Sequence, residues 1–99
     1  MAQIVFDEER AGKYAELLKA IGHPIRLRLV DILAAQGAKA VGDLADMLGV
    51  PQAIVSQQLR ILRLNGLVAA ERKSGNAFYQ LAEENLRNLL KCLRTCRTL

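Results

Sequence analysis

The feature that most constrains the fold of this chain is a glycine-containing turn, Leu48-Gly49-Val50-Pro51, between two short segments of helical periodicity. Residues 41–48, before the turn, place Leu44 and Ala45 on one face together with Leu48. Residues 52–64, after the turn, also repeat apolar side chains at three- and four-residue spacing. Because glycine lets the backbone reverse tightly, the two helices meet at a large angle. The sequence therefore predicts a helix-turn-helix.

Further glycine, proline and asparagine positions divide the rest of the chain into helix-sized segments. We expect a first helix from a cap at Asp7 to about Ala20, a second from Pro24 to a stop at Gly37, and a last one that begins at Glu83 or Glu84. The expected inward side chains are Ala11, Tyr14, Leu17, Leu18 and Ile21 in the first helix, Leu27, Val30, Leu33 and Ala34 in the second, Val55, Leu59 and Leu62 in the fourth, and Leu86, Leu89, Leu90 and Leu93 in the last.

The periodicity changes after Asn65-Gly66. Residues 67–73 and 77–81 are short and contain more β-compatible side chains, and Ser74-Gly75-Asn76 separates them. This pattern predicts a β-hairpin with a three-residue loop. The expected fold is mainly α with a small β-hairpin wing (α+β), with five helices, in a single domain that spans residues 1–99.

The composition points to a partner. Hydrophobic residues make up 52% of the chain, but aromatic residues only 4%, so the apolar content is mostly aliphatic. A chain of 99 residues buries a smaller share of its surface than a larger one, so we expect some of this content to be covered by a second copy. The formal net charge is +4, and residues 51–81 carry +3 of it. A basic excess concentrated in this way favours a polyanionic partner.

A secretory signal is not predicted, because Asp7 and the two acidic residues after it closely follow a very short apolar start. A membrane span is not predicted either, because no run approaches the roughly 18 apolar residues that it needs. We therefore expect a cytoplasmic protein without a membrane partner. In that compartment, Cys92 and Cys96 are expected to be reduced.

The helix after the turn carries the candidate binding residues. Gln52, Ser56 and Gln57 near its beginning suit hydrogen bonds to base edges in the major groove. Arg60 and Arg63 further along, and Arg72-Lys73 in the hairpin, suit contacts to phosphates. An amphipathic helix alone is most often a solvated surface helix. The combination of this helix with a glycine turn and a basic hairpin favours double-stranded DNA as the ligand. The small number of aromatic residues argues against single-stranded nucleic acid, which is bound by stacking on aromatic side chains.

These residues resemble the ArsR/SmtB family of bacterial winged-helix repressors. The resemblance lies in residues 18–30, in Asp43-Leu44-Ala45, Leu48-Gly49, Val55-Ser56 and Leu59-Arg60 of the helix-turn-helix, and in Leu64, Gly66-Leu67-Val68, Glu71-Arg72, Gly75, Tyr79 and Leu81 of the wing. It covers roughly residues 10–95. It implies a homodimer built on the first and last helices, and operator binding that is relieved by an inducer.

The chain also departs from the family pattern. Ala40 and Gly42 stand where metal-sensing members often place cysteines, and the one histidine, His23, cannot form a zinc site alone. We expect His23 to be a helix cap or a packed residue. Ile54 replaces a small polar residue on the recognition helix, and Asn76 replaces a wing arginine. The operator preference of relatives therefore does not transfer to this chain.

Cys92 and Cys96 leave two interpretations open. At i and i+4 they share one side of the last helix, where they could be small buried side chains of a dimer interface. They could also be a metal or redox sensor. An intrahelical disulfide would need the last turn to fray, because i,i+4 Cβ atoms lie about 5–6 Å apart and a disulfide needs about 3.5–4.5 Å. Arsenite or another soft metal ion spans this gap more easily.

The sequence supports no catalytic residues, because a Ser/His/Asp set, a metal cluster and a nucleotide-binding loop are all missing from it. The main hypothesis is a sequence-specific transcriptional repressor that a thiol-reactive inducer, whether arsenite, a soft metal ion or an oxidant, releases from DNA. Two alternatives stay open. One is a winged-helix module that binds another protein, and the other is a DNA-binding regulator without thiol sensing.

Overall fold

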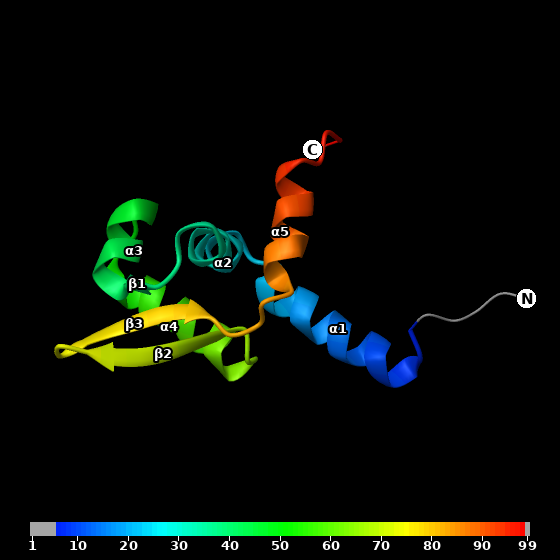
Figure 1. Cartoon of the computed structure of the whole chain (residues 1–99), viewed down its shortest axis with the longest axis horizontal. Helices are drawn as coiled ribbons and strands as arrows, with labels where there is room; N and C mark the ends of the chain where they lie inside the picture. Colours follow the sequence, from blue (N-terminus) through cyan, green and yellow to red (C-terminus); the bar gives the residue numbers. More distant parts are fainter. Residues whose placement is uncertain (1–5, 99) are drawn as a thin grey trace, which may run out of the picture.

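The computed structural model describes residues 6–98. In chain order the elements are α1 (Glu8–Ile21), α2 (Pro24–Gln36), β1 (Lys39–Ala40), α3 (Val41–Leu48), α4 (Gln52–Leu64), β2 (Val68–Lys73), β3 (Asn76–Leu81) and α5 (Leu86–Arg94). Figure 1 shows the helices α2, α3 and α4 beside the β-sheet, with α1 and α5 on the other side of α2. The predicted fold, five helices with a β-hairpin, is confirmed.

The ends of the first helices follow the expected local chemistry. The Asp7 side chain caps α1 by accepting a hydrogen bond from the backbone N–H of Arg10 at 2.8 Å. His23 is the N-cap of α2, and its Nδ1 accepts a hydrogen bond from the backbone N–H of Ile25 at 3.1 Å. Pro24 follows at the first helical position, where no N–H is needed. The expectation that His23 is a cap is therefore confirmed.

The sheet differs from the expected hairpin in two details. It has three antiparallel strands in the order β1-β3-β2, and β1 pairs Lys39 with Tyr79 and Ala40 with Phe78. A strand of two residues is too short to show an alternating pattern, so the sequence could not predict it. The hairpin loop has two residues, because Lys73 pairs directly with Asn76. The prediction of a three-residue loop was therefore wrong.

The positive φ angles of the loop residues explain its length. Ser74 has φ 52° and Gly75 has φ 79°, as a type I′ turn requires at both central positions. This turn twists in the same sense as the strands that it joins. Because Asn76 is the first residue of β3, it is part of the paired wing rather than of its tip.

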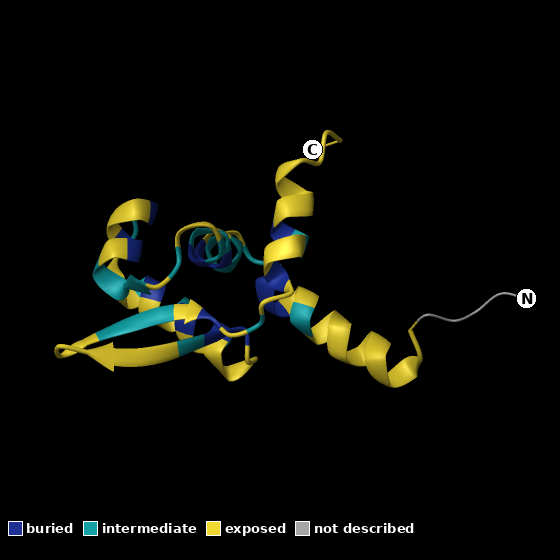
Figure 2. Cartoon of the chain, viewed as in Figure 1, coloured by how far each residue is buried: buried dark blue, intermediate teal, exposed yellow. Residues whose placement is uncertain are grey.

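The hydrophobic core lies where α2, α3 and α4 meet the inner end of the hairpin. Figure 2 shows the buried residues gathered there and at the bases of α1 and α5. The inner faces expected for α3 and α4 are confirmed, since Leu44, Val55 and Leu59 are fully buried. In α2, Leu29 is fully buried and Leu27 only partly. The expectation for α2 is therefore confirmed only in part: Val30 and Leu33 are fully buried as expected, but α2 is covered by α1, α3, α4, α5 and β3, so it has no single inner face.

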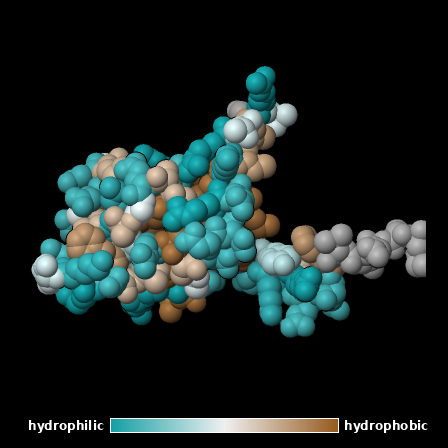
Figure 3. Space-filling view, viewed as in Figure 1, coloured by the Kyte–Doolittle hydropathy of each residue, from teal (hydrophilic) through white to brown (hydrophobic). Residues whose placement is uncertain are grey.

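The helix α1 extends away from the rest of the molecule (Figure 1) and adds only Ala20 and Ile21 to the core of the described chain. Tyr14 and Leu18, which we expected to face inward, are 43% and 52% exposed. On α5, Leu93 is 40% exposed. Figure 3 shows hydrophobic side chains at the junction of these two helices. The apolar stripe of α1 is therefore largely uncovered in the single chain, whereas that of α5 is uncovered only in part, because Leu86 and Leu90 are buried.

The last helix is shorter than expected. Backbone N–H groups of Leu86 and Arg87 bond to the carbonyls of Glu83 and Glu84, which form a turn that precedes α5. At the other end α5 stops at Arg94, and the hydroxyl of Thr95 lies 3.0 Å from the Cys92 carbonyl, to which it donates a hydrogen bond. The expected start at Glu83 or Glu84 was therefore wrong. No helix in the described part of the chain is long and apolar enough to cross a membrane.

Candidate nucleic-acid interface

The turn between α3 and α4 fixes the direction of the candidate recognition helix. Gly49 has φ 68°, a left-handed conformation that costs glycine little. Its N–H bonds to the Ala45 carbonyl at 2.8 Å and ends α3. Beyond the turn, Val55, Leu59 and Leu62 are fully buried. The opposite side of α4 is therefore held facing outward by the packing of its inner face.

The outer face of α4 carries the residues that the sequence singled out. Ser56, Gln57 and Arg60 line one open surface together with Ala53 and Ile54. Ser56, Gln57 and Arg60 are all exposed, whereas Ile54 is partly buried. Arg63 is exposed one turn further along. The surface thus runs from short polar side chains near the start of α4 to cationic ones toward its end.

Gln52 lies in a different place from Ser56 and Gln57. It lines a cleft between the start of α3 and the tip of the hairpin, together with Asp43, Arg72 and Asn76. The Gln52 Nε2 atom approaches Gly42 so closely that a Cβ built there would lie 3.4 Å from it. The structure therefore brings Gln52 and Arg72 to one cleft, although 19 positions separate them in the sequence.

The two cations of the wing do not share a face. Arg72 and Lys73 are neighbours in β2, and successive side chains of a strand point to opposite faces of the sheet. Arg72 lines the cleft with Gln52 and donates from Nη1 to the Gly75 carbonyl at 3.3 Å. Lys73 lies with its Nζ 3.9 Å from Glu71 Oε2, and both side chains are exposed. Only Arg72 therefore joins the surface that includes the start of α4.

One polar contact of α4 was not predicted from the sequence. The Nη1 atom of Arg26, on α2, donates a hydrogen bond to Gln58 Oε1 at 2.8 Å. Gln58 is partly buried, unlike the exposed Gln57 beside it. Its spacing was the available signal, because Gln58 lies three residues after Val55 and four before Leu62, both on the inner face.

The candidate thiols lie in the C-terminal part of the chain, in α5 and just beyond its end, away from the tip of the wing (Figure 1). Cys92 is exposed in α5, and Cys96 is exposed beyond the end of this helix, with its Sγ 3.3 Å from Thr98 Oγ1. The prediction that they share one side of a helix was therefore wrong, because α5 ends before Cys96. Within residues 6–98, no group of three or more His, Cys, Asp or Glu side chains could hold a metal ion.

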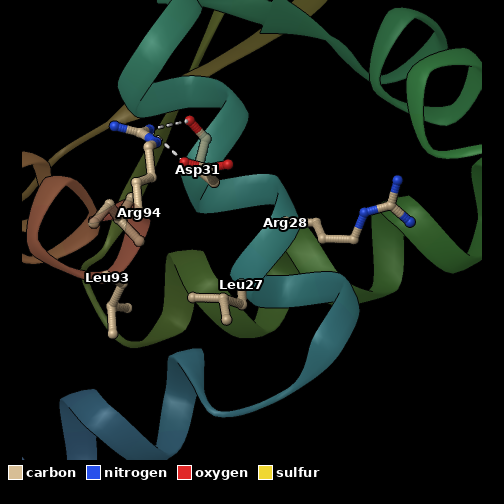
Figure 4. Close-up of a pocket in the computed structure, with 6 residues that line it drawn as sticks. Leu27, Arg28, Asp31, Leu93 and Arg94 are labelled. Carbon is tan, nitrogen blue, oxygen red and sulfur yellow. Dashed lines mark hydrogen bonds and ion pairs between the residues drawn. The ribbon is translucent and has the colours of Figure 1, made fainter. Parts of the chain in front are cut away.

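The helix that carries Cys92 is attached to α2. Figure 4 shows Arg94 reaching from α5 to Asp31, with which it forms an ion pair, while Arg28 points away from both. Leu27 and Leu93 line the hollow beside this ion pair. At the other end of α5, Arg87 donates to the Ala34 carbonyl of α2. The position of α5 is therefore fixed by polar contacts at both ends.

A helix-turn-helix with an outward polar face, followed by an antiparallel hairpin, defines a winged helix-turn-helix DNA-binding protein. The comparisons agree with this class. Residues 23–70 match the family described as "Bacterial regulatory protein, arsR family". The "Biofilm growth-associated repressor" of Xylella fastidiosa is 41% identical over 88 residues, which are 89% of this chain and 76% of the relative.

Solved structures extend the likeness to the whole fold. The transcriptional repressor BigR from Xylella fastidiosa matches with a TM-score of 0.82 and 41% identity, over 89% of each chain. The homodimeric winged helix-turn-helix domain of Mb0332 from Mycobacterium bovis matches with a TM-score of 0.76 and 28% identity, over 93% of this chain and 87% of that one. The chain belongs to the ArsR family. It is a DNA-binding transcriptional repressor and not an enzyme.

Proposed function

We propose that this repressor acts as a homodimer that reads a two-fold symmetric operator with α4 and the wing, and that a thiol-reactive inducer releases it. The whole chain, residues 1–99, acts as one domain in this proposal. Because the DNA of a bacterial cell lies in the cytoplasm, we place the protein there. The observation that carries the proposal is the outward polar surface of α4, held in place by the buried inner face.

The base-reading role belongs to Gln52, Ser56 and Gln57. Glutamine can bond both edge positions of adenine in the major groove, and serine can bond several bases. Arg60, Arg63, Arg72 and Lys73 hold phosphates on either side of the groove. The cleft that Gln52 and Arg72 line supports a joint contact by the helix and the wing. Two copies would read half-sites roughly 34–36 Å apart, one turn of DNA.

The dimer interface is formed by α1 and α5 in this proposal. Its support is the exposure of apolar side chains on both helices, including Tyr14, Leu18 and Leu93. Monomeric proteins rarely leave large contiguous apolar patches uncovered. The Mycobacterium bovis neighbour is homodimeric, which supports the same assembly.

Salt dependence tests the DNA-binding surface. A duplex selected by the protein from a random-sequence pool serves as the operator probe. If the dimer makes six to ten phosphate contacts, affinity should fall by about 10³–10⁵ between 50 and 200 mM salt. Fluorescence anisotropy at several salt concentrations measures this slope. A flat response would contradict the phosphate-binding role of the four cations.

The inducer acts through Cys92 and Cys96. Both thiols are exposed, so a soft ion or an oxidant can reach them. Because α5 ends at Arg94, an ion that binds both thiolates would reorder the residues around Cys96, beyond the end of the helix. Trivalent arsenic takes two such thiolates and a further ligand. This reordering would act on the same helix that contributes to the dimer interface.

The cysteine proposal is tested by titrating the selected duplex with wild-type protein and with a Cys92→Ser/Cys96→Ser variant. Each titration is repeated with arsenite and with an oxidant. We expect release of DNA by the wild type only. An identical response of both proteins would assign the cysteines a packing role and leave a repressor without thiol sensing.

A further inference from the structure

Arg26 connects three helices through two hydrogen bonds. It lies in the first turn of α2 and is partly buried. Its Nε donates to the Ala20 carbonyl in the last turn of α1 at 2.5 Å, and its Nη1 donates to Gln58 Oε1 on α4 at 2.8 Å. The last four carbonyls of a helix lack intrahelical partners, so the Ala20 carbonyl is available for this bond. Arg26 thus ties the end of α1 to α4.

The guanidinium makes this connection geometrically strict. Its N–H donors lie in one rigid plane, so the two acceptors must keep fixed relative positions. Gln58 must present its oxygen, because arginine offers only donors. A rotation of α4 about its own axis would move the Gln58 oxygen out of that plane. The contact therefore adds a polar restraint on the rotation of α4 relative to the end of α1, beyond the packing of the inner face of α4.

Gln58 is adjacent to the residues that we assign to base reading. Ser56 and Gln57 precede it on the same helix, and one residue corresponds to about 100° of rotation. The direction in which Gln57 points is therefore set by the direction in which Gln58 is held. Arg26 itself is partly buried and donates from two of its three guanidinium nitrogens inside the molecule, which argues against a contact of its own with phosphates.

We propose that Arg26 is a positioning residue for operator recognition, which acts through Gln58 to hold α4 at the rotation that aims Ser56 and Gln57 at the bases. Since Arg26 also holds the end of α1, it couples the orientation of the recognition helix to one of the proposed dimer helices. This inference rests on the proposed base-reading role of α4.

The test measures the ratio of affinities for two duplexes, one selected by the wild-type protein from a random pool and one of the same composition in shuffled order. Arg26→Met and Gln58→Met should each lower this ratio about tenfold, as expected for one charge-assisted hydrogen bond. The double variant should lower it no further than the single ones, because both changes remove the same contact.

Arg28→Met is the matched control, since it removes the same charge from an exposed position of α2, two residues away. Its ratio should change less than twofold. Gln58→Glu is the rescue variant, because it keeps an oxygen acceptor for Arg26. Its ratio should stay within about threefold of the wild type, although its added negative charge weakens binding to both duplexes.

Several results would overturn the proposal. If Arg26→Met lost the same factor of affinity for both duplexes, Arg26 would act only through its charge. An unchanged ratio with a lower free energy of unfolding would make the contact a support of the fold alone. If the double variant lowered the affinity ratio by the product of the two single effects, Arg26 and Gln58 would act independently rather than through one contact. If Arg26→Met does not fold, Gln58→Met decides, because it leaves the Arg26 bond to Ala20 intact. A wild type without preference for the selected duplex would instead reject the base-reading role itself.

Discussion

At the scale of single residues, the polar side chains of α4 divide into two groups that the sequence does not distinguish by type. Gln57 and Gln58 are the same amino acid in adjacent positions, yet one is exposed and the other contacts Arg26 at 2.8 Å. Their different roles follow from the helical period of 3.6 residues, which turns one amide to solvent and the other to the body of the molecule. Substitutions at the two positions should therefore have different signatures.

Replacing Gln57 by Ala should weaken binding to the selected operator by about 1–3 kcal/mol, because the pair of hydrogen bonds to one base is lost. Binding to a shuffled duplex should change little. Gln36→Ala is the control, since Gln36 is exposed at the end of α2, outside the recognition helix. Anisotropy titrations of both duplexes measure the effect. Equal losses on the two duplexes would remove Gln57 from base readout.

At the scale of elements, the geometry of the helix-turn-helix depends on one backbone conformation. A Cβ built at Gly49 would meet nothing within 4 Å among the described residues, so space does not exclude a larger side chain there. The φ angle of 68° is what disfavours a larger side chain at Gly49, because residues other than glycine adopt this region only at a cost in free energy. Gly12, in the middle of α1, also has open space for a Cβ but has no such φ angle.

Replacement by alanine should have opposite effects on stability at Gly49 and at Gly12. Gly49→Ala should lower the free energy of unfolding by about 1–2 kcal/mol, from the left-handed backbone alone. Gly12→Ala should raise it by about 0.5–1 kcal/mol, because alanine is favoured over glycine within a helix. Urea denaturation followed by circular dichroism measures both. A stabilised Gly49→Ala variant would contradict the assignment of this turn.

The wing makes a further prediction at this scale. Arg72→Ala and Lys73→Ala should each reduce the slope of log affinity against log salt by about 1, if each cation neutralises one phosphate. Lys13→Ala, which removes an exposed cation from α1, should leave the slope unchanged. Because Arg72 lines the cleft with Gln52, its loss should also affect operator binding more than the loss of Lys73. Equal salt slopes for the wild type and both wing variants would show that the hairpin makes no phosphate contact with DNA.

The elements were predictable where a local pattern is complete. The bounds of α3 and α4 and the burial of Val55, Leu59 and Leu62 follow from periodicity and from the glycine turn. The strand β1 was not predictable, because its two residues gain their pairing from a distant strand. The start of α5 was misplaced because acidic residues suit a turn before a helix as well as its first turn. The contact of Arg26 with Gln58 depends on how α2 crosses α4, which no local pattern encodes.

At the scale of the whole molecule, two helices hold apolar surface that the single chain does not cover. α1 extends from the body (Figure 1). α5 is held to α2 at one end by Arg94 (Figure 4) and at the other by Arg87. The exposed side chains on these helices include Leu18 and Leu93. Covering them with a second copy would place the two recognition helices at a fixed separation, as a two-fold operator requires.

Leu18→Lys should therefore break the proposed dimer. Two unpaired charges would be buried in one symmetric interface, which should raise the dimer dissociation constant more than about a hundredfold, or about 2.8 kcal/mol. Leu64→Lys is the matched control, because Leu64 is 74% exposed but lies on α4 rather than on the dimer helices. Analytical ultracentrifugation measures both. A Leu18→Lys protein with the wild-type dissociation constant would exclude this part of α1 from the interface.

The small share of α1 in the core of the single chain has a consequence for gene dosage. Only Ala20 and Ile21 of this helix are buried, so the rest of it would gain its packing from assembly. Folding and assembly then form one equilibrium, and the melting temperature rises with protein concentration. A cell that makes few copies would hold a repressor that is both less assembled and more easily degraded. Occupancy of the operator would then rise more steeply than in proportion to the number of copies synthesised.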